Sequence, residues 1–590
     1  MKLKYILLSI LFPAMTILFA SCFDDLNTTP LDPKLYTADK AYSTPESYMQ
    51  GLAKLYAALG LSGQSGPASA EIADVDAGTS PFLRTFWYMQ EFTTDEVTFT
   101  QSDPGCPELS YNTYSTLNNP IISGLYYRLL FTITMCNDYL KQTTDERLND
   151  RGVDDALRAN IQYYRSETRF LRALMYYHAM DMFGNTPFIT ENDPIGTYLP
   201  PQRSRAELYS FIESELLELS DDPHMTEPRQ NEYGRADKAA VWMLLSRLYL
   251  NAEVYIQTPK YDECMKYARN VISAEYDLCP NYAELFMADN GENTDARKEM
   301  IFTINFDGRW TQSYATQFLV AGSRGPNDPN FTQTSGISKS FKGSRATLTF
   351  VRHFYPGIDD FLGTMDEVVD DGNGSLGKYV NTLDNRAIFF TPTCHLPMSK
   401  NAGSSTFIYG WPSYKWTNLT REGIPPSYTD ENGNVISLTE YPSLDYPLMR
   451  LAEAYLNYAE AAVRKSGGTC TDALALEKLN ELRHRAKIQA EDLSSFTLDY
   501  IFGERSRELY WEAFRRTDLI RFGKYSGNDY TWEFKNGTFP GSAVPKYREL
   551  FPIPASDIGA NPNLTQNPYI FVRTFCDTCS AHFGCFTNCI

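Results

Sequence analysis

The chain has 590 residues, and 53 Lys and Arg side chains against 73 Asp and Glu give a formal net charge of −20. This charge argues against a protein that binds nucleic acid, because contact with phosphate backbones requires clustered basic side chains. A polytopic membrane protein is excluded as well, since the one long apolar run lies at the N-terminus. The hydrophobic share of 43% and the aromatic share of 14% indicate an acidic, aromatic-rich folded protein.

The N-terminus is predicted to be a lipoprotein signal peptide over residues 1–21. Lys2 and Lys4 precede an apolar stretch that ends in Ala20-Ser21-Cys22. Small residues before a Cys resemble a bacterial lipobox, in which the Cys22 thiol accepts a diacylglycerol. Because each buried CH₂ contributes about 0.8 kcal/mol, several acyl chains anchor a protein stably. We expect lipidation at Cys22; ordinary secretory cleavage is the alternative.

Residues 22–298 are predicted to form an N-terminal helical part. Apolar residues recur at helical spacing, and Ser204 with Glu207 forms a capping-box pattern. Small residues within the paired helices favour a tetratricopeptide-like array, although no clean repeat of about 34 residues survives. The expected helices cover 121–140, 165–183, 204–219, 236–255 and 261–274.

The pattern changes over residues 299–446, which we interpret as a long irregular insert rich in aromatic residues. Residues 301–306 alternate like a strand, and Asn432-Gly433 predicts a hairpin with a type I′ turn. Regular helices are not expected here. A stretch this long is too extensive for a linker, so we expect ordered loops and a β-hairpin carried on the helical frame.

Helical patterns return over 447–464, 472–486 and 498–515. Residues 447–572 are therefore predicted to be a C-terminal helical part with a closing loop, and residues 573–590 a Cys-rich tail. The fold class that follows is mainly α, a tetratricopeptide-like helical frame with a long irregular loop and β-hairpin insert.

The tail holds four of the 11 cysteines, Cys576, Cys579, Cys585 and Cys589, around His582. One Cys-x-x-Cys pair with a His suits tetrahedral zinc. The second pair lacks that spacing, so paired disulfides or a loose tail are favoured over a metal site. No metal is predicted.

Signatures of catalysis are weak. The Gly-rich run 372–378 approaches a P-loop pattern, but Tyr379 replaces the Ser or Thr that holds Mg²⁺, so a surface loop is favoured. Glycosidase chemistry needs only two carboxylates. The candidate pairs, Asp95 with Glu96 and Asp359 with Asp360, are adjacent in sequence, which is more typical of solvated loops. We expect no enzyme and no cofactor.

Aromatic side chains are the stronger candidates for ligand contact. Trp87, Trp242 and Trp511 lie in helical patterns and are predicted to pack in the core. Rings on the irregular insert are instead predicted to form exposed platforms, with polar neighbours that bind hydroxyl or amide groups. For any single ring, packing in the core is an equally good interpretation. The candidates are Trp310 with Arg309 and Tyr314, then Trp411 and Trp416, and a second cluster of Asp95, Phe99, Tyr111 and Tyr114.

Several motifs follow one another in a familiar order along the chain. They are Arg169-Phe170-Leu171-Arg172-Ala173, Gly184-Asn185-Thr186-Pro187, Gly234-Arg235-Ala236, Leu448-Met449-Arg450-Leu451-Ala452-Glu453, Glu504-Arg505, Asp518-Leu519-Ile520-Arg521 and Phe551-Pro552-Ile553-Pro554. Together with the lipobox, they resemble the SusD/RagB family of outer-membrane nutrient-binding lipoproteins.

The resemblance implies a helical frame that acts as a lid over a SusC-like TonB-dependent transporter, on an outer membrane to which the lipid anchors it. Arg169, Arg172, Glu504 and Arg505 would form ion pairs between helices. Most members bind glycans, whereas the RagB branch is linked to peptides. We therefore expect a surface-exposed lipoprotein that binds a glycan and delivers it to the transporter. Peptide capture is the alternative, and a surface glycosidase is a weaker one.

Overall fold

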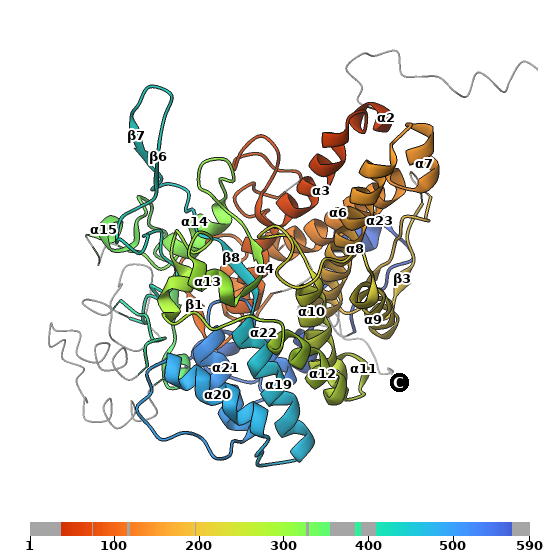
Figure 1. Ribbon diagram of the computed structural model, residues 1–590. Helices are drawn as coiled ribbons and strands as arrows, with labels where there is room; N and C mark the ends of the chain where they lie inside the picture. Colours follow the sequence, from red (N-terminus) through yellow and green to blue (C-terminus); the bar gives the residue numbers. More distant parts are fainter. Residues whose placement is uncertain are drawn as a thin grey trace, which may run out of the picture.

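The computed structural model is mainly helical (Figure 1) and describes residues 37–73, 75–114, 119–194, 196, 198–325, 328, 330–354, 384–390 and 409–568. Some predictions lie outside these residues, namely those on Cys22, on Asp359 and Asp360, on the Gly-rich run and on the Cys-rich tail.

Helices dominate the N-terminal half. Their bounds are α2 Ala38–Ala41, α3 Pro45–Gly60, α4 Phe82–Glu91, α5 Cys106–Ser110, α6 Pro120–Gln142, α7 Asp145–Asp150, α8 Asp155–Phe183, α9 Arg205–Asp221, α10 Lys238–Leu250, α11 Ala252–Ile256, α12 Tyr261–Ile272 and α13 Thr294–Glu299. The capping box of Ser204 and Glu207 is present at the start of α9. The helix α8 begins ten residues earlier than expected, because the Asp154 side chain caps its first turn.

The helices form an array that continues across the insert. Each helix packs on the next: α6 on α8, α8 on α9, α9 on α10 and α10 on α12. Helix α12 then packs on α19 (Leu451–Ser466). Since α12 and α19 are far apart in the sequence, the intervening chain leaves the array and returns to it. The C-terminal helices are completed by α20 Ala473–Arg485, α21 Leu498–Leu509, α22 Arg515–Arg521 and α23 Ala555–Ala560.

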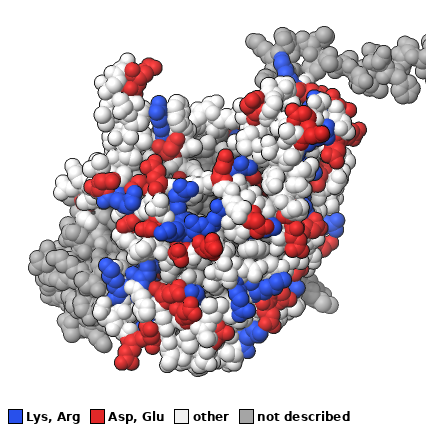
Figure 2. Space-filling view, in the orientation of Figure 1, with Lys and Arg blue, Asp and Glu red and all other residues white. Residues whose placement is uncertain are grey.

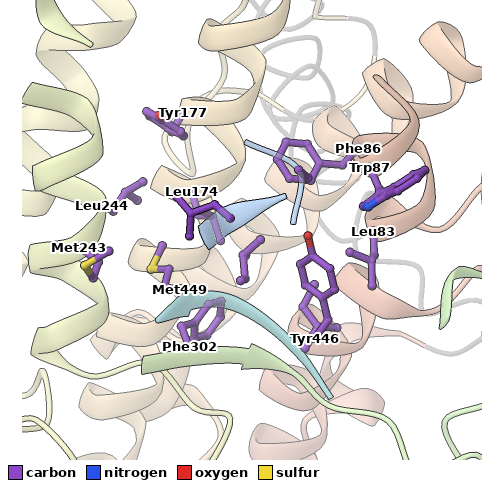
Figure 3. Packing of buried hydrophobic residues seen from close by; sticks show 14 of the residues in the cluster. Leu83, Phe86, Trp87, Leu174, Tyr177, Met243, Leu244, Phe302, Tyr446 and Met449 are labelled. Carbon is purple, nitrogen blue, oxygen red and sulfur yellow. The ribbon is translucent and has the colours of Figure 1, made fainter. Parts of the chain in front are cut away.

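Two buried strands close the base of the insert. The strands β4 (Met300–Ile304) and β8 (Tyr446–Arg450) pair antiparallel, with Met300 opposite Arg450. Figure 3 shows Phe302 of β4 and Met449 of β8 among side chains from α8 and α10. The expected helix over 447–464 is therefore wrong at its start, because residues up to Arg450 complete a strand pair. Both ends of the insert are held together in the core.

The remaining strands pair as β1 (Val97–Phe99) with β5 (Ser344–Ala346), β2 (Thr186–Pro187) with β3 (Gln202–Arg203), and β6 (Ser427–Thr429) with β7 (Val435–Ser437). The insert also holds short helices, α14 Tyr314–Ala321, α15 Phe331–Ser335 and α16 Leu348–Val351, where no regular helix was expected. Ser313 caps the first turn of α14, and seven of its eight residues are buried.

The predicted hairpin forms from β6 and β7 and stands out from the body (Figure 1). Its turn differs from the expected type I′. The Gly433 N–H donates to the Asp430 carbonyl at 3.0 Å, and Gly433 has a φ of 82°. Asn432 does not adopt a positive φ, which a type I′ turn requires. The Asp430 carboxylate accepts the N–H groups of Asn432 and Asn434 instead and stabilises this loop.

Arg169, Arg172 and Arg505 form ion pairs between helices, as the resemblance implied, whereas the expected helix-to-helix pair of Glu504 is wrong. Arg169 and Arg172 of α8 both bind Glu215 of α9. Arg505 of α21 binds Asp518 of α22, and Glu504 binds Arg386 from the insert. These side chains therefore hold elements together.

Five cysteines of the described part, Cys106, Cys136, Cys264, Cys279 and Cys470, are buried free thiols. Within the same residues, no helix has both the length and the apolar character required to cross a bilayer.

Candidate ligand-binding site

Within the insert, a group of rings lies where the loop after β4 meets the β6–β7 hairpin. We call it the ring cluster; its members are Arg309, Trp310, Tyr314, Tyr428 and Tyr441. The Trp310 side chain is 75% exposed. The guanidinium carbon of Arg309 lies 4.6 Å from the centre of the Trp310 ring and 4.1 Å from that of Tyr428 on β6. A cation between two rings joins the loop to the hairpin.

The Asp307 carboxylate fixes the loop that presents Trp310. Its Oδ1 accepts the backbone N–H groups of Arg309, Trp310 and Thr311 at 3.0, 2.7 and 2.9 Å. Burial alone would raise the pKa of Asp307, but these donors hold it below its ordinary value. The Trp310 ring is thus exposed on an ordered turn.

Tyr314 brings the ring cluster close to Arg84 of α4. Its ring meets Tyr441 edge-on, with centres 5.8 Å apart. Tyr314 opens α14, and Phe318 lies one turn later on the same face of the helix. A methyl group placed on Gly78 would lie 3.5 Å from the Tyr314 ring and 3.3 Å from the Arg84 guanidinium. The Tyr314 ring therefore lies close to Arg84, which lines a cavity.

That space, which we call the Arg84 cavity, has a volume of about 580 Å³. The Arg84 guanidinium lies over the rings of Tyr88 and Phe318, 5.2 and 5.1 Å from their centres. Its Nε donates to the Tyr88 hydroxyl at 2.8 Å and Nη1 to the Gly78 carbonyl at 2.6 Å. No carboxylate of the described residues pairs with it, so its positive charge remains available to a ligand.

The rim of the Arg84 cavity carries polar side chains of several kinds. They are Asp76, Thr79, Gln101, Asp103, Ser340 and Lys342, beside the half-buried ring of Phe341. Amide, hydroxyl, carboxylate and ammonium groups supply both donors and acceptors. Flat rings next to such a mixture suit a ligand with apolar faces and many hydroxyl groups.

Comparison with known proteins agrees with this fold. The sequence profile of the SusD family matches residues 390–569. The chain is 35% identical over 596 residues to the starch-binding protein SusD of Bacteroides thetaiotaomicron, an alignment that covers 96% of this chain and 99% of the relative. The chain belongs to the SusD family.

Solved structures show the same SusD-family fold. Surface glycan-binding protein A from Bacteroides fluxus has a TM-score of 0.62 at 19% identity, covering 89% of this chain and 99% of its own. A laminarin-binding SusD-like protein has a TM-score of 0.60 at 18% identity, with the same coverage. At these identities, the structures support the shared fold alone.

Within this SusD-family chain, the expected platforms at Trp411 and Trp416 are wrong, because both rings are 1% exposed. The Trp416 indole donates to the carbonyl of Trp511 at 3.1 Å and its ring stacks on Tyr446. Trp411 pairs with Ala346 next to β5. The core takes up both rings because the insert folds back on the frame.

Core packing is confirmed for Trp87 and Trp511, which are each 1% exposed. Trp242 is half-buried against the core, and its indole donates to Ser220 at 3.0 Å.

The second predicted cluster is also largely internal in this SusD-family chain. Asp95, Phe99 and Tyr114 are at most 4% exposed. Asp95 binds Arg515 at 2.7 Å and accepts the Tyr530 hydroxyl at 2.6 Å. Burial alone would raise the pKa of Asp95, but Arg515 holds it well below its usual range. These three side chains hold the frame together and do not contact solvent.

Tyr111, the fourth member, is half-buried, and its ring lies 5.7 Å from that of Phe534. The neighbouring Glu96 is 1% exposed, so the expected solvated loop around Asp95 and Glu96 is wrong too. Burial raises the pKa of Glu96 to about 8.

Sequence reasoning proposed Arg309, Trp310 and Tyr314, which remain candidates in this SusD-family chain, but missed the Arg84 cavity. Arg84 interrupts the apolar run of α4, and Asp76 lies in the short polar turn before it. A lone arginine within an apolar helix was the one feature of the sequence that could have indicated this cavity. Tyr428 and Tyr441 carried no signal, because only the tertiary fold brings Tyr428 to Arg309 and Tyr441 to Tyr314.

Proposed function

We propose that this SusD-family chain is a surface lipoprotein that binds a glycan across the ring cluster and the Arg84 cavity. The observation that carries the proposal is the exposed Trp310 ring, fixed on an ordered turn in a ring cluster whose member Tyr314 lies close to Arg84 of the cavity. Aromatic rings stack on the apolar faces of sugars, while the rim groups form hydrogen bonds with hydroxyls.

Glycans are favoured over peptides by the names of the relatives, which include a starch-binding, a laminarin-binding and surface glycan-binding proteins. Peptide capture remains the competing function, because rings and an arginine also bind peptides. The two are separated by the choice of ligand in the experiment below.

Binding without bond cleavage is part of the proposal. The adjacent carboxylates Asp95 and Glu96 are buried and occupied by Arg515, Ser506 and the Trp511 N–H. A glycosidase needs its carboxylates beside the glycosidic bond. We further propose that the lipid on Cys22 anchors the chain to the outer membrane, where it closes over a SusC-like TonB-dependent transporter and delivers the glycan.

The binding test compares Trp310→Ala and Arg84→Gln with the parent chain by calorimetry on starch and laminarin oligosaccharides and on a peptide mixture. Tyr163→Ala, which removes a 39% exposed ring from α8, is the matched control. We expect at least tenfold weaker glycan binding in the two site variants, a loss of about 1.4 kcal/mol, and no change in the control. Unchanged affinity in both site variants, or binding of peptides alone, would contradict the proposal.

Delivery and anchoring have separate tests. A tagged chain extracted from outer membranes in mild detergent is expected to bring a TonB-dependent transporter with it. Labelling with a fatty-acid probe is expected to disappear in Cys22→Ala, and retained labelling would rule out this anchor. Recovery of the chain alone under all extraction conditions would argue against the transporter.

A further inference from the structure

A second cavity, which shares no lining residue with the Arg84 cavity, is lined by several basic side chains. It has a volume of about 290 Å³ and lies between α13, the start of β4 and the loop before α10. We call it the basic cavity; the cations that line it are Arg229, Arg235, Arg297 and Lys298. Figure 2 shows a hollow on this face bordered by Lys and Arg side chains. Such a concentration is unexpected in a chain of net charge −20.

Two of the four cations have acidic partners. Arg235 binds the buried carboxylate of Glu167, and a second carboxylate, Glu232, lies 3.3 Å from it. Lys298 binds Asp295 at 3.0 Å. These two basic side chains are therefore largely neutralised by the protein itself.

Arg229 and Arg297 differ, because no carboxylate of the described residues pairs with either. The guanidinium carbon of Arg297 lies 4.5 Å from the centre of the Tyr233 ring. That of Arg229 lies 5.4 Å from the centre of Tyr276, and its Nη1 donates to the Glu275 carbonyl at 2.7 Å. A guanidinium held on a ring keeps its edge N–H groups available for a ligand.

The one buried carboxylate on the cavity wall, Asp237, is already satisfied. It accepts the N–H groups of Ala239, Ala240 and Arg229 at 2.9, 3.2 and 2.8 Å, at the N-terminus of α10. The protein's own amides thus occupy the Asp237 oxygens, and its side chain forms no ion pair with Arg229 or Arg297 among the described residues.

We propose that the basic cavity binds an oxyanion group, a carboxylate, sulfate or phosphate, either free or carried by a single sugar residue. Guanidinium groups bind such oxyanions through paired hydrogen bonds. The volume is at the lower end of the range for ligand pockets, which suits one residue and not a polymer. The hydroxyls of Thr294 and Thr303 and the Asn231 amide also line the cavity and supply neutral hydrogen bonds.

The test titrates the full chain by calorimetry at low ionic strength with sodium sulfate, sodium phosphate, sodium glucuronate, glucose and sodium chloride. Sulfate, phosphate or glucuronate is expected to bind, and glucose and chloride are not. Binding by the inorganic anions as well as glucuronate assigns the site to the oxyanion itself, and binding by glucuronate alone assigns it to a sugar acid. Heats equal to those of chloride for all three oxyanions would overturn the proposal.

Variants locate the binding. Arg229→Gln combined with Arg297→Gln is expected to weaken oxyanion binding at least tenfold, and Arg297→Lys to weaken it less, since charge is kept but the paired hydrogen bonds are lost. Lys266→Gln removes an exposed cation 4.8 Å from the centre of the Tyr267 ring on α12, away from the cavity, and should change nothing. An equal effect of Lys266→Gln would show general charge screening and overturn the proposal.

The double variant is expected to keep the parent thermal unfolding midpoint, because neither arginine holds an ion pair of the described residues. If the midpoint falls, Arg297→Lys, which retains the charge over Tyr233, still tests the site. Trp310→Ala should leave oxyanion binding unchanged, so failure of this proposal and failure of the glycan site are distinguishable.

Discussion

Trp310 and Trp416 belong to the same insert, yet one ring is 75% exposed and the other 1%. Trp416 has a buried carbonyl, that of Trp511, for its indole N–H and a ring, Tyr446, on which to stack. The Trp310 backbone is instead fixed by Asp307, and Arg309 covers part of the ring from one side. The surroundings that each backbone reaches decide whether an indole packs in the core or faces solvent.

The burial of Asp445 should make the stability of the protein depend on pH. It is 6% exposed, its Oδ1 accepts the Phe306 N–H at 2.8 Å, and burial raises its pKa to about 7. Its contribution to stability is therefore fully present below about pH 4, the pKa of an unfolded Asp, and is lost as the pH rises through 7. In the parent chain, the free energy of unfolding should fall by about 2 to 4 kcal/mol across that window because of Asp445. Asp445→Asn keeps the acceptor oxygen but cannot ionise, so we expect this fall to be absent in the variant.

Urea unfolding of both proteins between pH 4 and 8 checks this difference. Asp262→Asn, which changes an exposed carboxylate, is the control and should follow the parent curve. Parallel curves for Asp445→Asn and the parent chain would show that Asp445 does not titrate in this range.

At the scale of elements, the insert is held by its ends. The strand pair β4–β8 brings its two ends together, and the contact of α12 with α19 continues the helical array past it. Loops between these ends are then free to vary in length without interrupting the frame. This arrangement explains how one chain carries both a rigid array and an irregular ligand-binding region.

Loosening the turn that presents Trp310 should weaken glycan binding. Asp307→Ala removes the acceptor of three backbone N–H groups, so the ring is expected to lose its fixed position and glycan affinity to fall threefold to tenfold. Calorimetry measures the affinity, and circular dichroism should show an unchanged thermal midpoint.

The control is Asp193→Ala, which removes a similar side-chain acceptor from the Thr190 turn, far from the site in the fold. An affinity loss of the same size in this control would mean that the Asp307 turn has no particular role.

At the scale of the molecule, a buried network of charges joins the frame to the insert. Arg450, which is 1% exposed, binds Glu299, Glu508 and Glu512. Burial alone would raise the pKa of Glu508, but Arg485, Arg450 and Arg386 hold it well below its ordinary value. The buried charges therefore neutralise one another across several elements, namely β8, α13, α20, α21 and the insert.

Removing one member of this network should be costly. Arg450→Met leaves Glu299, Glu508 and Glu512 short of a cation in the core, so we expect a loss of about 3 to 5 kcal/mol in unfolding free energy. Urea unfolding followed by tryptophan fluorescence measures it. Arg203→Ala, which breaks an exposed pair with Glu207, is expected to cost less than about 1 kcal/mol. Comparable losses in the two variants would contradict the proposed role of the network.

The helical frame was predictable because its signals are local. Ser204 with Glu207 starts α9, and Gly184 ends α8 at a φ of 71°, as short-range rules require. The strand at 446–450 was missed, because its partner β4 lies far away in the sequence.

The amino-acid sequence by itself determined the fold class and the family resemblance, since caps, helical periodicity and motif order act over short distances. Only the tertiary structure decided which rings face solvent, where Arg84 opens a cavity, and how Arg229 and Arg297 come together on one wall. Burial and charge pairing depend on segments hundreds of residues apart, and no local pattern records which of them meet.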